Sequence, residues 1–132
     1  NVCPRALVIR TNFYGWGPSY RKSFSDYIIS NLRDNKPIKL FTDVYFTPII
    51  ICKLVDVIHE LLTKNLFGLF NVVGDERISK FMFGKKIAQV FMLDDNLVLP
   101  DLIINRKGEL KSSPLFYFLL FSRESTYKST FL

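Results

Sequence analysis

A short loop carries the side chains best suited to hold a ligand. Residues 5–10 form a compact apolar run with charged ends, which is typical of a buried strand. Asn12 and Tyr14 follow in a segment rich in glycine and aromatic residues. The Asn12 amide donates and accepts hydrogen bonds, and Tyr14 offers a ring face and a hydroxyl. Because ligands of open α/β sheets bind where strands end, this loop is a candidate binding site. A turn whose side chains only pack locally is an equally good interpretation.

The rest of the sequence predicts no catalytic constellation and no metal site. His59 is the only histidine, and its spacing from neighbouring carboxylates matches no recognised ligand set. There is no Gly-x-Ser-x-Gly turn and no Cys/His pair at a suitable spacing. Gly15 and Gly17 lack the further glycine or Lys-Ser/Thr of a phosphate loop. The acidic pairs at 75–76 and 94–95 suit helix starts and solvation better than acid–base catalysis.

Composition is typical of a globular domain in a reducing compartment. The 132 residues are 48% hydrophobic, and no apolar run approaches the roughly 20 residues of a membrane helix. Cys3 and Cys52 form no disulfide framework or zinc motif, and no leader follows Asn1, so we expect free thiols and a cytoplasmic location. Because Asn1 is not Met, we expect a sequence that starts within a longer protein or has been processed. The net charge of +6 forms no Lys/Arg stripe, which favours a mixed solvated surface over nucleic-acid or membrane binding.

Hydrophobic periodicity predicts strands that alternate with amphipathic helices. Strands are expected at residues 5–10, 38–42 and 69–73, and a weaker one at 44–51, which contains a proline. A first helix is expected after Ser23 or Ser25, a second over residues 54–62 with its stop near Gly68, and a third after Ser79. The predicted inner faces of the first and third helices are Phe24, Tyr27, Ile28 and Leu32, and Phe83, Ile87, Val90 and Phe91. This order predicts an α/β layer structure.

The end of the chain differs from the rest, so we divide it into residues 1–104 and a divergent tail at 105–132. Residues 115–121 are uncharged, aromatic and free of proline, which is typical of an aggregation-prone segment. Three interpretations stay open: a buried strand, a disordered tail, or non-native sequence such as a shift of reading frame would produce.

Three segments, in order, resemble the extended short-chain dehydrogenase/reductases. Residues 6–15 (ALVIRTNFYG) are similar to the segment that follows the active-site Tyr-x-x-x-Lys helix of that family. Residues 40–48 (LFTDVYFTP), leading into residues 54–56, are similar to its substrate loop. Residues 68–74 (GLFNVVG) resemble its Gly-x-(Tyr/Phe)-(Asn/His)-Val-x-Gly strand, followed by its helix. The branch most resembled is the sugar-nucleotide-binding subgroup of the dTDP-4-dehydrorhamnose reductase type.

The resemblance implies the C-terminal portion of a Rossmann-type, NAD(P)-binding α/β fold with a small substrate-binding subdomain. It implies substrate contacts at Asn12, Tyr14, Phe46 and Thr47, and a cofactor contact at Thr11. The parent family uses NAD(P) to reduce or epimerise the sugar of a nucleotide sugar. The implied partners are therefore the nucleotide-sugar substrate and the N-terminal Rossmann half that this chain lacks.

The chain departs from the family pattern in its catalytic motifs. It contains neither Gly-x-x-Gly-x-x-Gly nor Tyr-x-x-x-Lys, so we expect no catalytic residue, cofactor binding or turnover from this chain alone. Residues 111–114 stand where the family has Arg-Pro-x-Asp. Two alternatives follow. One is a non-catalytic regulatory subunit, since the methionine adenosyltransferase regulatory subunit resembles the same reductases. The other is an inactive truncated product that exposes apolar surface.

Overall fold

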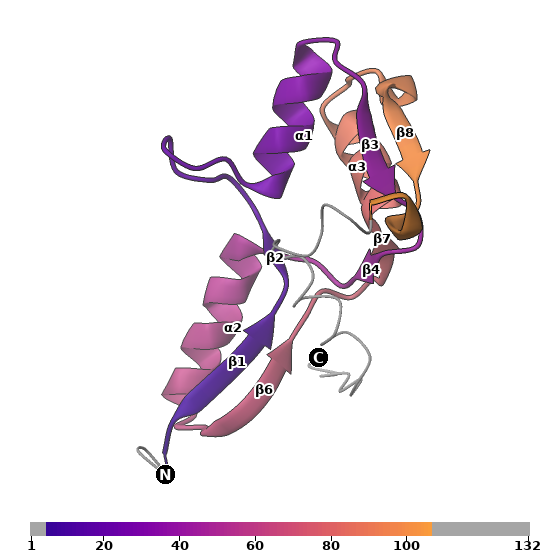
Figure 1. Ribbon diagram of the computed structural model, residues 1–132. Coiled ribbons are helices and arrows are strands. Elements are labelled where there is room, and N and C mark those ends of the chain that lie inside the picture. The colour runs from indigo at the N-terminus through magenta and orange to yellow at the C-terminus, as the bar shows by residue number, and fades with distance from the viewer. Residues whose placement is uncertain (1–4, 107–132) are drawn as a thin grey trace.

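The computed structural model describes residues 5–106, so Cys3 and nearly all of the predicted tail lie outside the described residues. The elements form two lobes joined through the middle (Figure 1). One lobe contains β1 (Leu7–Thr11), α2 (Ile51–Thr63) and β6 (Gly68–Val72). The other contains α1 (Phe24–Arg33), β3 (Ile38–Phe41), α3 (Lys80–Val90) and β8 (Val98–Asp101), with 3-10 helices at Asp95–Leu97 and Ile103–Arg106. The remaining short strands are β2 (Phe13–Tyr14), β4 (Tyr45–Phe46), β5 (Ile49–Ile50) and β7 (Ile78–Ser79).

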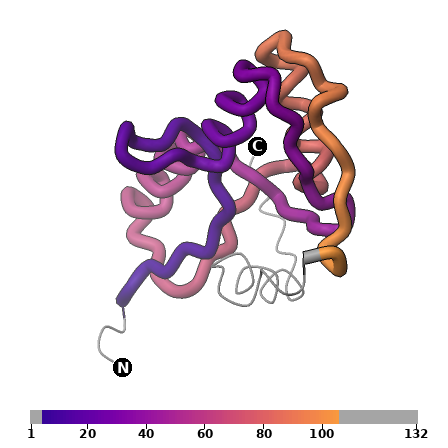
Figure 2. Tube along the Cα trace, turned by 45° about the horizontal axis from the view of Figure 1, so that its top comes forward, coloured from indigo at the N-terminus to yellow at the C-terminus, as the bar shows by residue number. Residues whose placement is uncertain are grey.

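Strand pairing joins distant parts of the described chain. β1 runs parallel to β6, in register from Leu7 with Gly68 to Thr11 with Val72. β2 with β5 and β3 with β8 are also parallel, whereas β4 with β7 is antiparallel. Parallel pairs need crossover connections, and helices lie between the paired strands in the sequence. The predicted α/β class is thereby confirmed. Figure 2 shows the β1–β6 and β3–β8 pairs at opposite ends of the molecule in a second view.

Each lobe has its own hydrophobic core. In one lobe, α2 packs Leu54 and Leu61 with Val72 of β6 and Ile49 of β5. In the other, α1 and α3 pack together and against β3 and β8. Its buried side chains are Ile28, Ile29, Leu32, Ile38, Leu40, Phe46, Ile78, Phe83, Ile87, Ala88 and Val98. None of the helices in the described part of the chain is long and apolar enough to cross a membrane.

The predicted caps of α1 and α3 are confirmed, but two inner-face predictions are wrong. The Ser23 and Ser79 hydroxyls accept hydrogen bonds from the backbone N–H groups of the third helical residues. Tyr27 and Val90, predicted to face inward, are 45% and 76% exposed. In α1, Ile29 is buried instead of Tyr27, because α3 packs on the side that carries Ile28, Ile29 and Leu32. Periodicity predicts a stripe but not the direction from which the neighbouring helix packs.

Two further boundaries differ from the sequence prediction. The second helix ends at Thr63, and Asn65, with φ 52°, adopts the left-handed conformation that follows a helix end. Gly68 therefore does not stop the helix; it opens β6 with a φ of +107°. The 44–51 stretch holds β4, β5 and the first residue of α2 rather than one strand. The sequence does not predict β8, because Pro100 argues against a strand.

The β1–β6 pair is covered on one face only among the described residues. Leu7 and Ile9 pack with the core under α2, whereas Val8 is 50% exposed and its register partner Leu69 is 52% exposed. Successive strand residues point to opposite faces, and α2 covers just one of them (Figure 1). The prediction of a buried strand at residues 5–10 is therefore wrong on one face of β1, as far as the described residues go.

Candidate functional site

The end of β1 meets the segment after β4 in the middle of the molecule. Thr11 ends β1 opposite Val72 of β6, so two parallel strands finish side by side. The next residue, Asn12, accepts a hydrogen bond at its backbone oxygen from the Ile49 N–H at 2.8 Å. This bond and the β2–β5 pairing place Asn12 and Tyr14 beside the residues that follow Phe46.

A close backbone approach fixes the position of Thr47. The Gly74 N–H, just beyond β6, donates to the Thr47 carbonyl oxygen at 3.2 Å. A Cβ at Gly74 would overlap the Pro48 carbonyl oxygen, so only glycine fits there without movement. Thr47 is thus held against the end of the β1–β6 pair, where ligands of open α/β sheets bind.

Phe83 of α3 brings the two predicted aromatic contacts together. Its ring centroid lies 5.2 Å from that of Tyr14 and 5.2 Å from that of Phe46, in edge-to-face geometry. It also stacks on Phe24 of α1 at 5.9 Å. The structure therefore gathers Asn12, Tyr14, Phe46 and Thr47 in one region. That they touch a substrate stays a prediction.

The sequence analysis missed Lys80. Its Nζ lies 3.5 Å from the Phe46 ring centroid and 4.6 Å from that of Phe24. Burial lowers the pKa of the Lys80 ammonium to about 8. One signal could have revealed it: a lysine directly after the cap residue Ser79 places positive charge at a helix N-terminus, where the dipole disfavours it.

Thr11 has an unusual hydroxyl at the same strand end. Its Oγ1 is buried and has no hydrogen-bond partner among the described residues. An orphaned polar atom of this kind fits the predicted contact with a cofactor, because a buried hydroxyl without a partner carries a free-energy cost. No phosphate-cradling loop accompanies it in the sequence.

The remaining polar candidates show no arrangement for catalysis. Asp75 and Glu76 are exposed and pair with Lys53 at 3.7 Å and Lys86 at 2.6 Å. His59 is exposed on α2, and no three His, Cys, Asp or Glu side chains gather as a metal site within residues 5–106. Cys52 is an exposed free thiol.

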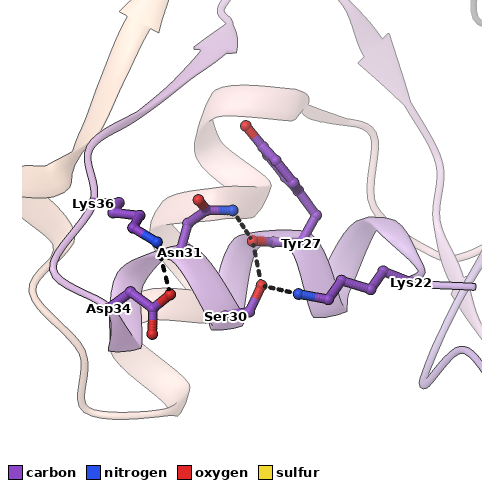
Figure 3. Close-up of polar contacts among 6 residues, drawn as sticks. All are labelled: Lys22, Tyr27, Ser30, Asn31, Asp34 and Lys36. Carbon is purple, nitrogen blue, oxygen red and sulfur yellow. Dashed lines mark hydrogen bonds and ion pairs between the residues drawn. The ribbon is translucent and has the colours of Figure 1, made fainter. Parts of the chain in front are cut away.

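An open groove of about 400 Å³ lies elsewhere, between residues 16–22 and α1. It is lined by Trp16, Gly17, Pro18, Ser19, Lys22, Asp26, Ile29, Ser30, Arg33 and Asp34. Figure 3 shows part of its polar wall, where Lys22 Nζ donates to Ser30 Oγ at 3.3 Å and Lys36 pairs with Asp34 at 3.1 Å. None of the five predicted site residues lines this groove. We place the candidate site at the strand ends, because the predicted site residues and the buried, unpartnered Thr11 hydroxyl lie there.

The fold indicates the class of protein to which the chain is similar. The described residues match the C-terminal part of Rossmann-like reductases, an α/β fold whose first portion this chain does not contain. No protein-family model matches the chain. It is 31% identical over 101 residues to the probable low-salt glycan biosynthesis reductase Agl14 of Haloferax volcanii, covering 74% of this chain and 34% of that protein.

The solved structures agree with this likeness. A dTDP-4-dehydrorhamnose reductase of Bacillus anthracis, in complex with NADP, has a TM-score of 0.68 and 25% identity, covering 76% of this chain and 35% of that one. A hypothetical dTDP-4-dehydrorhamnose reductase of Sulfolobus tokodaii has a TM-score of 0.63 and 33% identity, covering 74% and 33%. The chain thus resembles dTDP-4-dehydrorhamnose reductases in sequence and fold, and it spans about a third of their length.

Proposed function

We propose that this chain is the C-terminal, substrate-binding portion of an NAD(P)-dependent nucleotide-sugar reductase or epimerase. The observation that carries the proposal is the convergence of Asn12, Tyr14, Phe46 and Thr47 at the carboxyl end of the β1–β6 pair. The likeness to dTDP-4-dehydrorhamnose reductases supports it, because the match covers 76% and 74% of this chain in two solved structures.

The side chains of the candidate site contact different parts of the ligand. The Asn12 amide and the Thr47 hydroxyl pair with sugar hydroxyls, which both donate and accept hydrogen bonds. Tyr14 and Phe46 offer apolar ring surface to the sugar, held in place by Phe83. Thr11 contributes a hydroxyl toward the cofactor, which supplies the hydride when it is bound.

The proposed partner is a dinucleotide-binding half that completes the sheet. Parallel sheets occur almost only with both faces covered, and isolated two-stranded pairs are marginally stable. The exposed Val8 and Leu69 are register partners, and they alternate along the strands with residues that pack under α2, so they lie on the opposite face of β1–β6. A segment that continues the sheet and covers this face would also carry the glycine-rich loop and the Tyr-x-x-x-Lys motif.

A titration with a dTDP-sugar tests the proposal. We expect saturable binding to the purified chain, followed by calorimetry or amide chemical shifts. Asn12→Ala should weaken binding about fivefold or more, because it removes hydrogen bonds to the ligand. Asn31→Ala is the matched control, since the Asn31 amide donates to the Tyr27 carbonyl oxygen on α1 and lies outside the candidate site. No saturable binding, or equal losses in the two variants, would contradict the proposal.

A further inference from the structure

A lysine ammonium lies among the aromatic side chains of the candidate site. Lys80 and Phe83 are three residues apart on α3 and share one face of that helix. Both contact Phe24 and Phe46, and Phe83 also contacts Tyr14. The Lys80 charge is therefore a neighbour of two predicted substrate contacts, although the sequence analysis assigned it no role.

This is a costly position for a positive charge. Burial removes hydration from the ammonium and lowers the pKa of Lys80 to about 8. The N-terminus of α3 adds to the cost, because the helix dipole favours negative charge there. Cation–π attraction to Phe24 and Phe46 offsets part of it. Local conflicts of this kind are typical of functional positions.

The matching ligand is an anion with several oxygen acceptors. An ammonium that has already lost much of its water pays less desolvation on binding than a solvated surface lysine does. Its bonds to phosphate oxygens are charge-assisted and strengthened by the low local dielectric. The rings of Phe24 and Phe46 restrict the side chain, so little further ordering is needed.

We propose that Lys80 is a phosphate-binding residue of the candidate site and that it contacts the diphosphate of the nucleotide sugar. The identity of the ligand rests on the proposed function, whereas the preference for phosphate oxygens rests on the surroundings of Lys80 alone. Tyr14 and Phe46, on the same aromatic cluster, then lie next to the sugar-bearing end of that diphosphate.

Variants at Lys80 and Arg77 separate a local contact from general attraction. Lys80→Met keeps apolar volume between the rings and removes the charge, whereas Lys80→Arg keeps a charge. Arg77→Met is the matched control: the Arg77 guanidinium lies 4.7 Å from the ring centroid of Tyr45. Tyr45 and Phe46 are successive strand residues that point to opposite faces of β4, so Arg77 stacks on the other side of the same strand.

Calorimetric titration of the full 132-residue chain with inorganic pyrophosphate is the first arm of the test. We expect the affinity to fall about tenfold or more in Lys80→Met, to stay within about threefold in Lys80→Arg, and to change less than about twofold in Arg77→Met. No binding by the wild-type chain, an unchanged affinity in Lys80→Met, or equal losses in Lys80→Met and Arg77→Met would each overturn the proposal. Equal losses would show diffuse attraction by the net charge of +6.

The second arm uses a dTDP-sugar and keeps the two proposals apart. Binding of the dTDP-sugar that survives Lys80→Met leaves the proposed function standing and overturns the role of Lys80. If pyrophosphate depends on Lys80 but the dTDP-sugar neither binds nor competes, the phosphate site stands and the nucleotide-sugar function fails. Circular dichroism of each variant checks that it is folded, and Lys80→Arg keeps the test decisive if Lys80→Met unfolds.

Discussion

Single residues decide the chemistry that this chain can offer. Phe83, which is 6% exposed, is the side chain through which Tyr14, Phe24 and Phe46 meet. Aromatic pairs in edge-to-face geometry add stability beyond their buried area, so these contacts help to hold Tyr14 and Phe46 in place. Lys80 adds a positive charge next to the rings of Phe24 and Phe46.

Lys80 also gives the fold a pH dependence that can be measured. The pKa of its ammonium is about 8 in the folded chain and 10.5 in the unfolded chain. Between these values the unfolded chain binds more protons, so the stability contributed at Lys80 rises with pH through this window. Below pH 8 the desolvation penalty is present in full, and above pH 10.5 it has disappeared.

We therefore expect the free energy of unfolding of the wild type, minus that of Lys80→Met, to rise by about 1–3 kcal/mol from roughly pH 7 to roughly pH 10. Urea unfolding of both proteins at matched pH values measures it. Taking the difference cancels contributions that are the same in both proteins. A difference that stays constant across this range would contradict the assignment of the low pKa to Lys80.

At the scale of elements, α1 begins where a small polar network holds it. The Ser23 hydroxyl accepts from the Asp26 N–H at 3.1 Å, and the Asp26 carboxylate accepts from Ser23 N at 2.9 Å and Gly17 N at 2.8 Å. These backbone hydrogen bonds, that of Ser23 first, lower the pKa of the Asp26 carboxyl below 3.8. Its contribution to stability is thus present above pH 3.8 and is lost as the pH falls through the folded pKa.

Two serines two residues apart should respond differently to removal of the hydroxyl. Ser23→Ala should cost about 1 kcal/mol of the free energy of unfolding, because it leaves the α1 N-terminus without its cap. Ser25 is buried, and its Oγ has no hydrogen-bond partner among the described residues, so Ser25→Ala should be neutral or stabilising. Chemical denaturation of both variants measures the contrast. A larger loss for Ser25→Ala than for Ser23→Ala would show that the cap is not where the structure has it.

At the scale of the whole molecule, the two lobes differ in how fully they are covered. Within residues 5–106, α1 and α3 pack against the β3 side of the second core, whereas α2 alone covers the β1–β6 pair (Figures 1 and 2). An apolar face left open on a parallel pair favours association with a further segment. The described part of the chain thus has the form expected of a portion that docks onto a larger sheet.

Neighbouring residues of β1 provide the test of this uneven coverage. Val8→Thr, at a half-exposed position, should change the free energy of unfolding by less than about 0.5 kcal/mol. Ile9→Thr, on the face packed under α2, should cost on the order of 1–3 kcal/mol, because it puts a hydroxyl into the core. Denaturant unfolding of the two variants measures both. Equal losses would mean that both faces of β1 are buried in the isolated chain.

Much of the local structure could be predicted from the sequence. The strands at residues 7–11, 38–41 and 68–72, the caps Ser23 and Ser79, and the α/β class follow from short-range patterns. Strand alternation, helical spacing and capping depend on residues that are close together in the sequence, so they can be recognised without the tertiary structure. The segments around Asn12, Phe46 and Gly74, which the sequence singled out, meet in the structure, whereas their role as a binding site stays a prediction.

Other features depended on contacts between residues far apart in the chain. Three features depend on where another element packs. They are the inward position of Ile29 instead of Tyr27, the pairing of β3 with β8 at Pro100, and the close approach of Gly74 to Pro48. The same holds for the surroundings of Lys80, which looks like a surface lysine in the sequence and lies against Phe24 of α1 and Phe46 of β4 in the structure. A periodic pattern specifies which side chains share a face of a helix or strand. Which element packs against that face depends on the tertiary structure. The burial of each side chain, the pKa of Lys80 and the assembly of the candidate site follow from that packing.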